Sequence, residues 1–151
     1  MSLNQIFDIA GSGMSAQSIR LNTTSSNIAN AETASSSVDE TYRARKPIFS
    51  AVHHEAMGGG RGGQEPMAFS REQLESKGVS VDAIVESDGE LEMRYQPEHP
   101  MADEDGYVYY PNVNVVEEMA DMMSASRSFQ TNVEVMNTAK SMMQRVMTLG
   151  Q

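Results

Sequence analysis

Large apolar residues recur at intervals of seven near both ends of the chain, and this spacing limits the possible folds more than any other feature. A seven-residue interval returns to the same face of an α-helix, so such a stripe predicts a helix that packs along a partner. We expect two long terminal helices that pair as an α-helical hairpin or coiled coil, with an interface formed by Phe7, Met14, Leu21, Ile28, Val115, Met122, Phe129, Met136 and Met143.

Local chemistry predicts how these helices are supported and where the second one begins. The first helix should span Leu3 to Ile28, although Gly11 and Gly13 each cost about 1 kcal/mol relative to alanine in a helix interior. The helix therefore needs support from partners or bends at the glycines. Asn114 is a candidate N-cap of the second helix, because a glutamate follows three residues later as in a capping box.

The sequence between the two apolar stripes changes in composition and in apolar spacing at about residue 35, and its pattern favours strands. Extended segments are predicted at 41–52, 79–85 and 91–95, with a short aromatic strand at 107–110. Residues 87–89, a serine, an aspartate and a glycine, favour a hairpin turn that joins 79–85 to 91–95. The middle of the chain is expected to be a small β-rich insertion.

The predicted fold class is therefore mainly α with a β-rich insertion between two long helices. We divide the chain into an N-terminal helix at 1–34, a β-rich middle domain at 35–111 and a C-terminal helix at 112–151. The middle domain carries a glycine-rich segment at 57–64, which we interpret as a flexible loop because glycine permits many backbone conformations.

The first 34 residues are unusually poor in charge. Asp8, Arg20 and Glu32 are the only charged side chains there, and the stretch "LNTTSSNIANAETA" is dominated by small polar and small apolar residues. A helix with one solvated face normally carries more charge, so this composition favours packing against neighbouring helices on more than one side. Candidate amides for polar contacts across such helices are Asn27, Asn30 and Asn132.

The composition excludes several classes of function. The net charge is −10, which disfavours nucleic-acid binding because that binding depends on Lys and Arg neutralising phosphates. The chain has no cysteine, so disulfides, thiolate metal sites and cysteine nucleophiles are excluded. No apolar run approaches the about 18 residues that suggest a membrane span, and the N-terminus lacks the basic and apolar regions of a cleaved signal peptide.

Residues that could carry chemistry do not form a recognisable site. His53, His54 and Glu55 are neighbours, but successive residues of an extended segment point to opposite faces, so we expect no metal site. "DEDG" at 103–106 lacks the flanking acidic ligands of a calcium loop and predicts a tight turn. We predict no catalytic residues, no metal and no cofactor, and hence no enzyme.

Several segments resemble one protein family. "NTTSSNIANAETA" (22–34) resembles the asparagine-rich N-terminal signature of flagellar rod, hook and hook-associated proteins. "HPMADEDGYVYYPNVNVVEEMADMMSASRSFQTNVEVMNTAKSMM" (99–143) is similar to the C-terminal region of flagellar basal-body rod proteins. "TYRARKPIF" (41–49) and "GVSVDAIVES" (78–87) resemble their middle region. The resemblance covers about the whole chain.

The resemblance implies a structural subunit of the proximal rod in the bacterial flagellar basal body, which transmits torque from the motor to the hook. It also implies a location in the periplasm-spanning rod, partners among proximal and distal rod proteins and the hook–basal-body complex, and export by the flagellar type III apparatus without a cleaved signal peptide. A helical adaptor or export chaperone of the same secretion system is the alternative, since a methionine-rich helix also suits a promiscuous binding groove.

Overall fold

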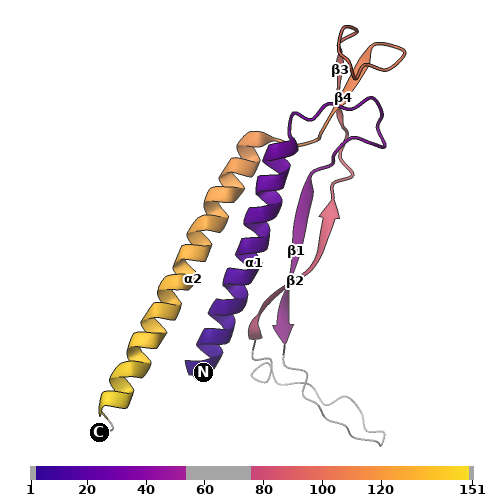
Figure 1. Cartoon of the computed structure of the whole chain (residues 1–151). Helices are drawn as coiled ribbons and strands as arrows, with labels where there is room; N and C mark the ends of the chain where they lie inside the picture. Colours follow the sequence, from indigo (N-terminus) through magenta and orange to yellow (C-terminus); the bar gives the residue numbers. More distant parts are fainter. Residues whose placement is uncertain (1–2, 54–75, 150–151) are drawn as a thin grey trace, which may run out of the picture.

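A computed structural model describes residues 3–53 and 76–149 of the chain. In chain order the elements are α1 (Leu3–Asn30), β1 (Arg45–His53), β2 (Ser76–Glu86), β3 (Glu92–Tyr95), β4 (Tyr107–Tyr110) and α2 (Val115–Leu149). Figure 1 shows α1 between antiparallel α2 on one side and the β1–β2 pair on the other. The predicted helical hairpin with a β-rich insertion is confirmed.

The two helices pack through small side chains. The buried apolar residues of α1 are Ala10 and Ala16, and those of α2 are Ala125 and Ala139. Because α1 is the only described helix or strand that α2 contacts, the burial of the two α2 alanines reports the contact between the helices. Small residues along this line allow the two backbones to approach closely, and α1 continues through its glycines without interruption.

Two separate two-stranded sheets make up the β-rich region. β1 pairs antiparallel with β2 from Arg45 opposite Glu86 onward, and β3 pairs antiparallel with β4 from Glu92 opposite Tyr110. The predicted strands are therefore present, but the predicted hairpin between 79–85 and 91–95 is wrong, because these two segments belong to different sheets.

The misassigned turn at 87–89 has a physical explanation in its carbonyl groups. The Asn112 amide donates to the Gly89 carbonyl at 3.0 Å and to the Ser87 carbonyl at 3.4 Å, and Arg43 donates to the same two carbonyls at 3.3 Å. These donors come from distant segments. They fix residues 87–89 in a conformation that connects the two sheets, so the chain does not reverse direction there.

Two locally encoded features form as expected. The Asn114 side chain accepts from the backbone N–H groups of Val116 at 3.1 Å and Glu117 at 3.4 Å, which confirms it as the N-cap of α2. The Asp103 side chain accepts from the N–H groups of Asp105 and Tyr107, and Gly106 adopts a φ of 84°, which confirms the tight turn. The glycine-rich segment at 57–64, His54 and Glu55 lie outside the described residues.

β2 is attached to α1 through a close backbone approach. The Ser12 hydroxyl donates to the Ile9 carbonyl at 2.9 Å and accepts from the Val79 N–H at 3.1 Å. Gly78 has a φ of 136°, and a Cβ at this position would lie 2.1 Å from the Ser12 Oγ. Only glycine fits this site, because both the backbone conformation and the available space exclude a side chain.

Candidate assembly surface

Asn27 joins the end of α1 to the start of β1. Its Nδ2 donates to the Arg45 carbonyl at 2.8 Å, and its Oδ1 accepts from the Arg45 N–H at 3.0 Å and the Tyr42 hydroxyl at 2.8 Å. The side chain is only 1% exposed. One amide thus pairs with both backbone groups of a single residue, and it fixes the direction in which the chain leaves the helix.

Asn112 makes a second junction of the same kind, just before α2. Its Oδ1 accepts from the Ala44 N–H at 2.9 Å, while its amide holds the 87–89 carbonyls described above. Ser35 and Tyr109 exchange two backbone hydrogen bonds of 3.0 Å, which tie the segment after α1 to β4. The adjacent Val108 is 0% exposed. We call this group of contacts, centred on Asn27, Asn112 and Val108, the junction.

The line of contact between the helices does not run along the predicted stripe. On α2 the line follows Glu118, Ala125, Asn132 and Ala139, each three positions after a stripe residue. Three of these are buried. The fourth, Asn132, lies against Gly13, because a Cβ on that glycine would be 2.8 Å from the Asn132 Nδ2. We call this line the seam.

The predicted stripe residues flank the seam. Val115 is exposed at 36%, and the other eight are half-buried: Phe7, Met14, Leu21, Ile28, Met122, Phe129, Met136 and Met143. Each of these large side chains therefore has contact on one side and solvent on the other. The structure brings the stripe residues beside the seam, and their contacts beyond the single chain stay a prediction.

The three predicted amides have different surroundings in this chain. Asn27 bonds to the start of β1, as described above, and Asn30 donates to the Ser26 carbonyl of its own helix at 2.8 Å. Asn132 alone lies at the contact between the helices, against Gly13. Amide contacts between helices of different subunits stay a prediction.

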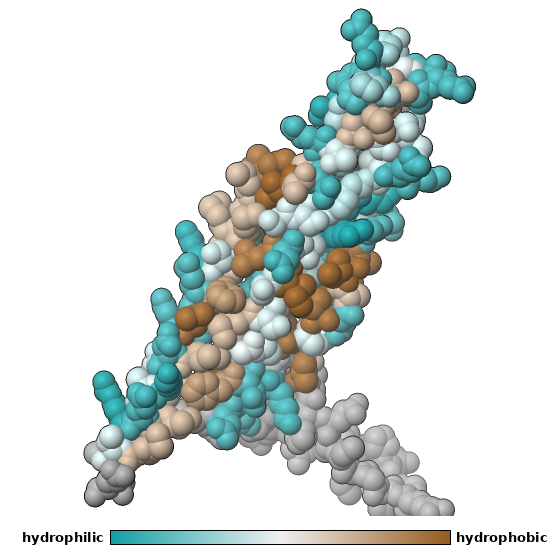
Figure 2. All heavy atoms as spheres, viewed as in Figure 1, coloured by the Kyte–Doolittle hydropathy of each residue, from teal (hydrophilic) through white to brown (hydrophobic). Residues whose placement is uncertain are grey.

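Further apolar surface is exposed on both outer sides of the molecule. On α2, Val116 is 76% exposed, and Met119 and Met123 are also exposed. On the sheet, Ile48 and Ile84 are exposed. Figure 2 shows apolar residues along the helices and over β1–β2, whereas hydrophilic residues dominate the β3–β4 end. Contiguous apolar surface of this kind is typical of proteins that bind other chains.

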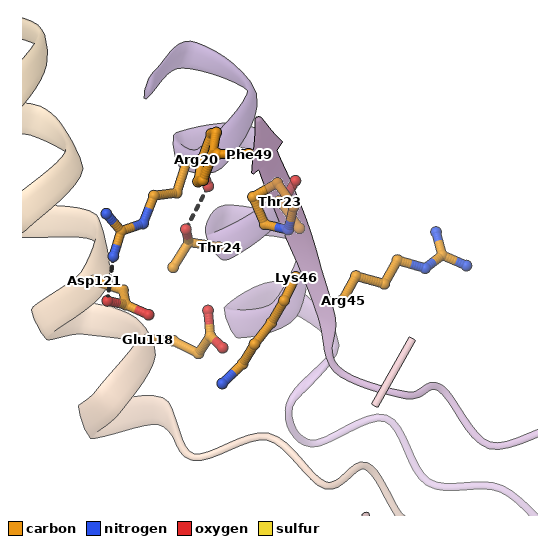
Figure 3. Close-up of a pocket in the computed structure, with 9 residues that line it drawn as sticks. Arg20, Thr23, Thr24, Arg45, Lys46, Phe49, Glu118 and Asp121 are labelled. Carbon is orange, nitrogen blue, oxygen red and sulfur yellow. Dashed lines mark hydrogen bonds and ion pairs between the residues drawn. The ribbon is translucent and has the colours of Figure 1, made fainter. Parts of the chain in front are cut away.

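A groove of about 300 Å³ opens where α1, β1 and α2 meet (Figure 3). Arg20 of α1 and Asp121 of α2 form an ion pair of 2.6 Å across it. Because both side chains are partly exposed, this pair contributes at most about 1 kcal/mol. Thr23, Thr24 and Glu118 are buried beside the pair. The groove thus lies beside Glu118, the first residue of the seam.

The described part of the chain has neither a candidate metal site nor a helix that could span a membrane. Residues 3–53 and 76–149 contain no group of three or more potential metal-ligating side chains. Within the same residues, neither helix is apolar enough over a sufficient length to cross a membrane.

Two family models match the two ends of the chain. Residues 7–34 match the model described as "Flagella basal body rod protein", and residues 104–149 match "Flagellar basal body rod FlgEFG protein C-terminal". The first match covers most of α1 and the turn after it, and the second covers β4 and α2. The matched regions therefore include both helices and part of the junction.

Curated relatives match over the full length. The flagellar basal-body rod protein FlgC of Salmonella typhimurium is 44% identical over 153 residues, which is 100% of both chains. FlgC of Escherichia coli O6:H1 is 45% identical over 151 residues, again 100% of both. FlgC of Borreliella burgdorferi is 34% identical and covers 100% of this chain and 99% of the relative. None of these names indicates a catalytic activity.

Proposed function

The chain belongs to the flagellar basal-body rod protein FlgC family and has a structural role in the flagellar rod, and from this we propose that it is a proximal rod subunit that transmits torque through packed helices. The observation that supports this mechanism is the arrangement of the stripe around the seam. The two helices already bind each other through small residues, so the large residues beside them are left with one open side.

Neighbouring subunits would close that open side. Fully burying a side chain of this size contributes about 1.5 to 3 kcal/mol, so half-buried stripe residues retain a large part of that free energy for contacts beyond the chain. Many such contacts around a tube would resist rotation of one subunit against the next. In this proposal torque passes through interlocked side chains, and no reaction is involved.

The three segments of the chain would then have different tasks. The helices at 1–34 and 112–151 form the packed part of the rod, and 35–111 holds their relative position through the junction. The proposed partners are proximal and distal rod proteins within the hook–basal-body complex. The proposed route to the rod is the flagellar type III apparatus, without a cleaved signal peptide.

The direct test is mass spectrometry of hook–basal bodies purified from the source bacterium, with and without the gene for this chain. We expect a small, constant copy number in the complexes, and we expect the deletion strain to lack a rod. If the chain is absent from the complexes and instead co-purifies with exported subunits in the cytoplasm, it is the adaptor or chaperone considered as the alternative.

A stripe variant tests the packing mechanism separately. Met136→Asp places a charge beside the seam, where a partner subunit would have to bury it at a cost of several kcal/mol. We expect its amount in purified rods to fall by at least about tenfold, since about 1.4 kcal/mol already corresponds to a factor of ten. Thr138→Asp, at an exposed position two residues away, is the matched control. Normal incorporation and swimming with Met136→Asp would contradict the role of the stripe.

A further inference from the structure

β1 and β2 form a two-stranded ribbon with much of its apolar surface uncovered. Each strand has one partner strand among the described residues, so its outer edge carries backbone groups that no described strand pairs. An open edge with apolar, β-branched residues is a template for pairing with another chain, so it needs protection. The large apolar side chains of the ribbon that are exposed are Ile48, Phe49, Val52, Val79, Ile84 and Val85.

Charged side chains interrupt this apolar sequence at two places, both in β2. Residues 78–85 are glycine, serine, alanine and β-branched residues, and Asp82 is the only charged residue among them. Lys77 comes directly before this stretch. The facing part of β1, residues 48–52, carries no charge. A short β-branched segment without charge is typical of sequences that form cross-β aggregates, and a charge within it opposes this.

Both of these charged residues are the extra residues of β-bulges. Over one step along β1 the paired position on β2 changes from 83 to 81, so Asp82 lies opposite no residue of β1. Over a later step the paired position changes from 78 to 76, so Lys77 is passed over in the same way. A bulge disrupts the ladder locally, bends the strand and twists its edge away, so a further strand cannot pair regularly along it.

The Asp82 carboxylate is fixed on one face of the ribbon. It accepts from the hydroxyls of Ser50 at 2.6 Å and Ser80 at 3.0 Å, and these two serines lie opposite each other on the two strands. The side chain is exposed, so this face presents a fixed negative charge. Sheets stack in cross-β structures through dry faces, where an unpaired carboxylate is costly to bury. Asp82 therefore opposes edge pairing by its bulge and face stacking by its charge.

The bulge at Asp82 also lies between the two points at which the ribbon is attached to α1. At one end Asn27 bonds to the backbone of Arg45 in β1. At the other end Ser12 accepts from the N–H of Val79 in β2. Figure 1 shows the two strands crossing between these ends, and a bulge increases such local twist. A role in twist alone would predict that substitution of Asp82 lowers stability without promoting self-association.

We propose that Asp82 and Lys77 prevent the ribbon from forming cross-β aggregates with the ribbons of other copies of this chain. The two residues do this without covering the apolar side chains, which stay available to a partner that does not pair as a strand. The protection acts in the isolated chain, so it does not depend on the proposed role in the rod.

Self-association of the purified full chain tests the proposal. Asp82→Val should lower the concentration at which the chain aggregates by at least about tenfold, which corresponds to about 1.4 kcal/mol, because no carboxylate then has to be buried between ribbons. Sedimentation velocity measures this concentration, and thioflavin T fluorescence reports cross-β structure. Asp88→Val is the matched control, since it removes the same charge and adds the same side chain at an exposed position outside the strands. It should behave like the natural chain.

Two further variants test the second charge and the bulge itself. Lys77→Val should promote aggregation, whereas Lys140→Val, at an exposed position of α2, should not. Deletion of Asp82 removes the charge and the extra residue together, while residues 81 and 83 can keep their pairing with β1. The deletion should therefore promote aggregation at least as strongly as Asp82→Val does.

Aggregation that follows from unfolding is distinguished with Asn27→Ala, which weakens the junction but keeps both charges. Asn27→Ala and Asp82→Val are compared at urea concentrations that unfold the same fraction of each, and only Asp82→Val should raise thioflavin T fluorescence. If Asp82→Val does not fold, Asp82→Asn takes its place with a smaller effect of the same sign, because it lacks the charge but keeps an oxygen that accepts from the serines.

Three outcomes would overturn the proposal. The first is equal association of Asp82→Val and Asp88→Val, or of Lys77→Val and Lys140→Val. The second is an equal thioflavin T signal from Asn27→Ala. The third is a loss of stability in Asp82→Val without any aggregation, which would leave Asp82 with a role in the twist of the ribbon only.

Discussion

The junction and the helix pair differ in how completely a single chain satisfies them. At the junction, Asn27 is buried with three hydrogen bonds and Val108 is entirely covered. Along the helices, the covered residues are alanines such as Ala125, while large side chains such as Phe129 remain half-exposed. The junction is therefore complete within the monomer, whereas the helix pair has large apolar side chains that a neighbour can still cover.

The largest expected effect is at the junction. Asn27→Ala leaves the Arg45 N–H and carbonyl without their partners, and each unsatisfied buried group costs about 1 to 3 kcal/mol. We expect a loss of about 3 kcal/mol in the free energy of unfolding, measured by urea denaturation of the isolated chain. Asn30→Ala is the control, because Asn30 bonds only within its own helix. Equal losses for both variants would mean that the junction has no special role.

A pair of variants on α2 separates the seam from the stripe. Ala125→Leu overpacks a fully buried position and should destabilise the isolated chain by about 2 kcal/mol. Phe129→Ala removes a half-buried ring, so its cost in the isolated chain should stay below the about 3 to 5 kcal/mol of a fully buried Phe, while its incorporation into rods drops. A loss of 3 kcal/mol or more, on the order of a fully buried ring, would show that the monomer already uses the whole side chain.

The difference between predicted stripe and observed seam shows what periodicity can determine. A seven-residue spacing predicted both helices and their pairing correctly, because it depends only on the helical repeat. It did not choose between Phe129 and Asn132, which are neighbours on the same broad face at a spacing of three. The fully buried positions between the backbones belong to small residues such as Ala125, and Gly13 lies against Asn132, while the large residues of the stripe flank this contact and their packing against other subunits stays a prediction.

Local and long-range features of the insertion and of its border with α2 were not equally predictable. The cap at Asn114 and the turn at Asp103 follow from side chains that bond to their own neighbourhood, and both were predicted. The sequence did not reveal that β2 pairs with β1, because residues 54–75 separate the two strands along the chain. The residues at 87–89 follow β2 directly and have the composition of a turn, so they suggested a pairing with the next strand instead. The sequence did not predict the structural role of Asn112, because its hydrogen-bond partners at Ala44 and Gly89 are remote in sequence.

Two glycines in α1 test how closely the two helices approach each other. A Cβ at Gly11 would meet nothing within 4 Å, so Gly11→Ala should stabilise the isolated chain by up to about 1 kcal/mol through helix propensity. At Gly13 the same gain is offset, because the new Cβ would lie 2.8 Å from the Asn132 amide. Melting temperatures of the two variants measure the difference. An equal rise for both would show that the helices do not approach closely at Gly13.

The smallest expected effect is on the exposed sheet. The Ser50 hydroxyl donates to Asp82 at 2.6 Å and the Ser80 hydroxyl at 3.0 Å, and these two bonds lower the pKa of the Asp82 carboxyl. Because the folded pKa is lowered, the stabilisation is present above the ordinary value of 3.8 and is lost as the pH falls through the folded value.

Asp82→Asn should therefore slightly reduce stability at pH 7 and narrow its difference from the natural chain as the pH drops below about 4. Thermal melts between neutral and acidic pH measure this convergence. Asp88→Asn, whose exposed carboxylate accepts none of these serine bonds, is the matched control. If the gap between Asp82→Asn and the natural chain instead widens on acidification, the serine bonds do not hold the ionised carboxylate.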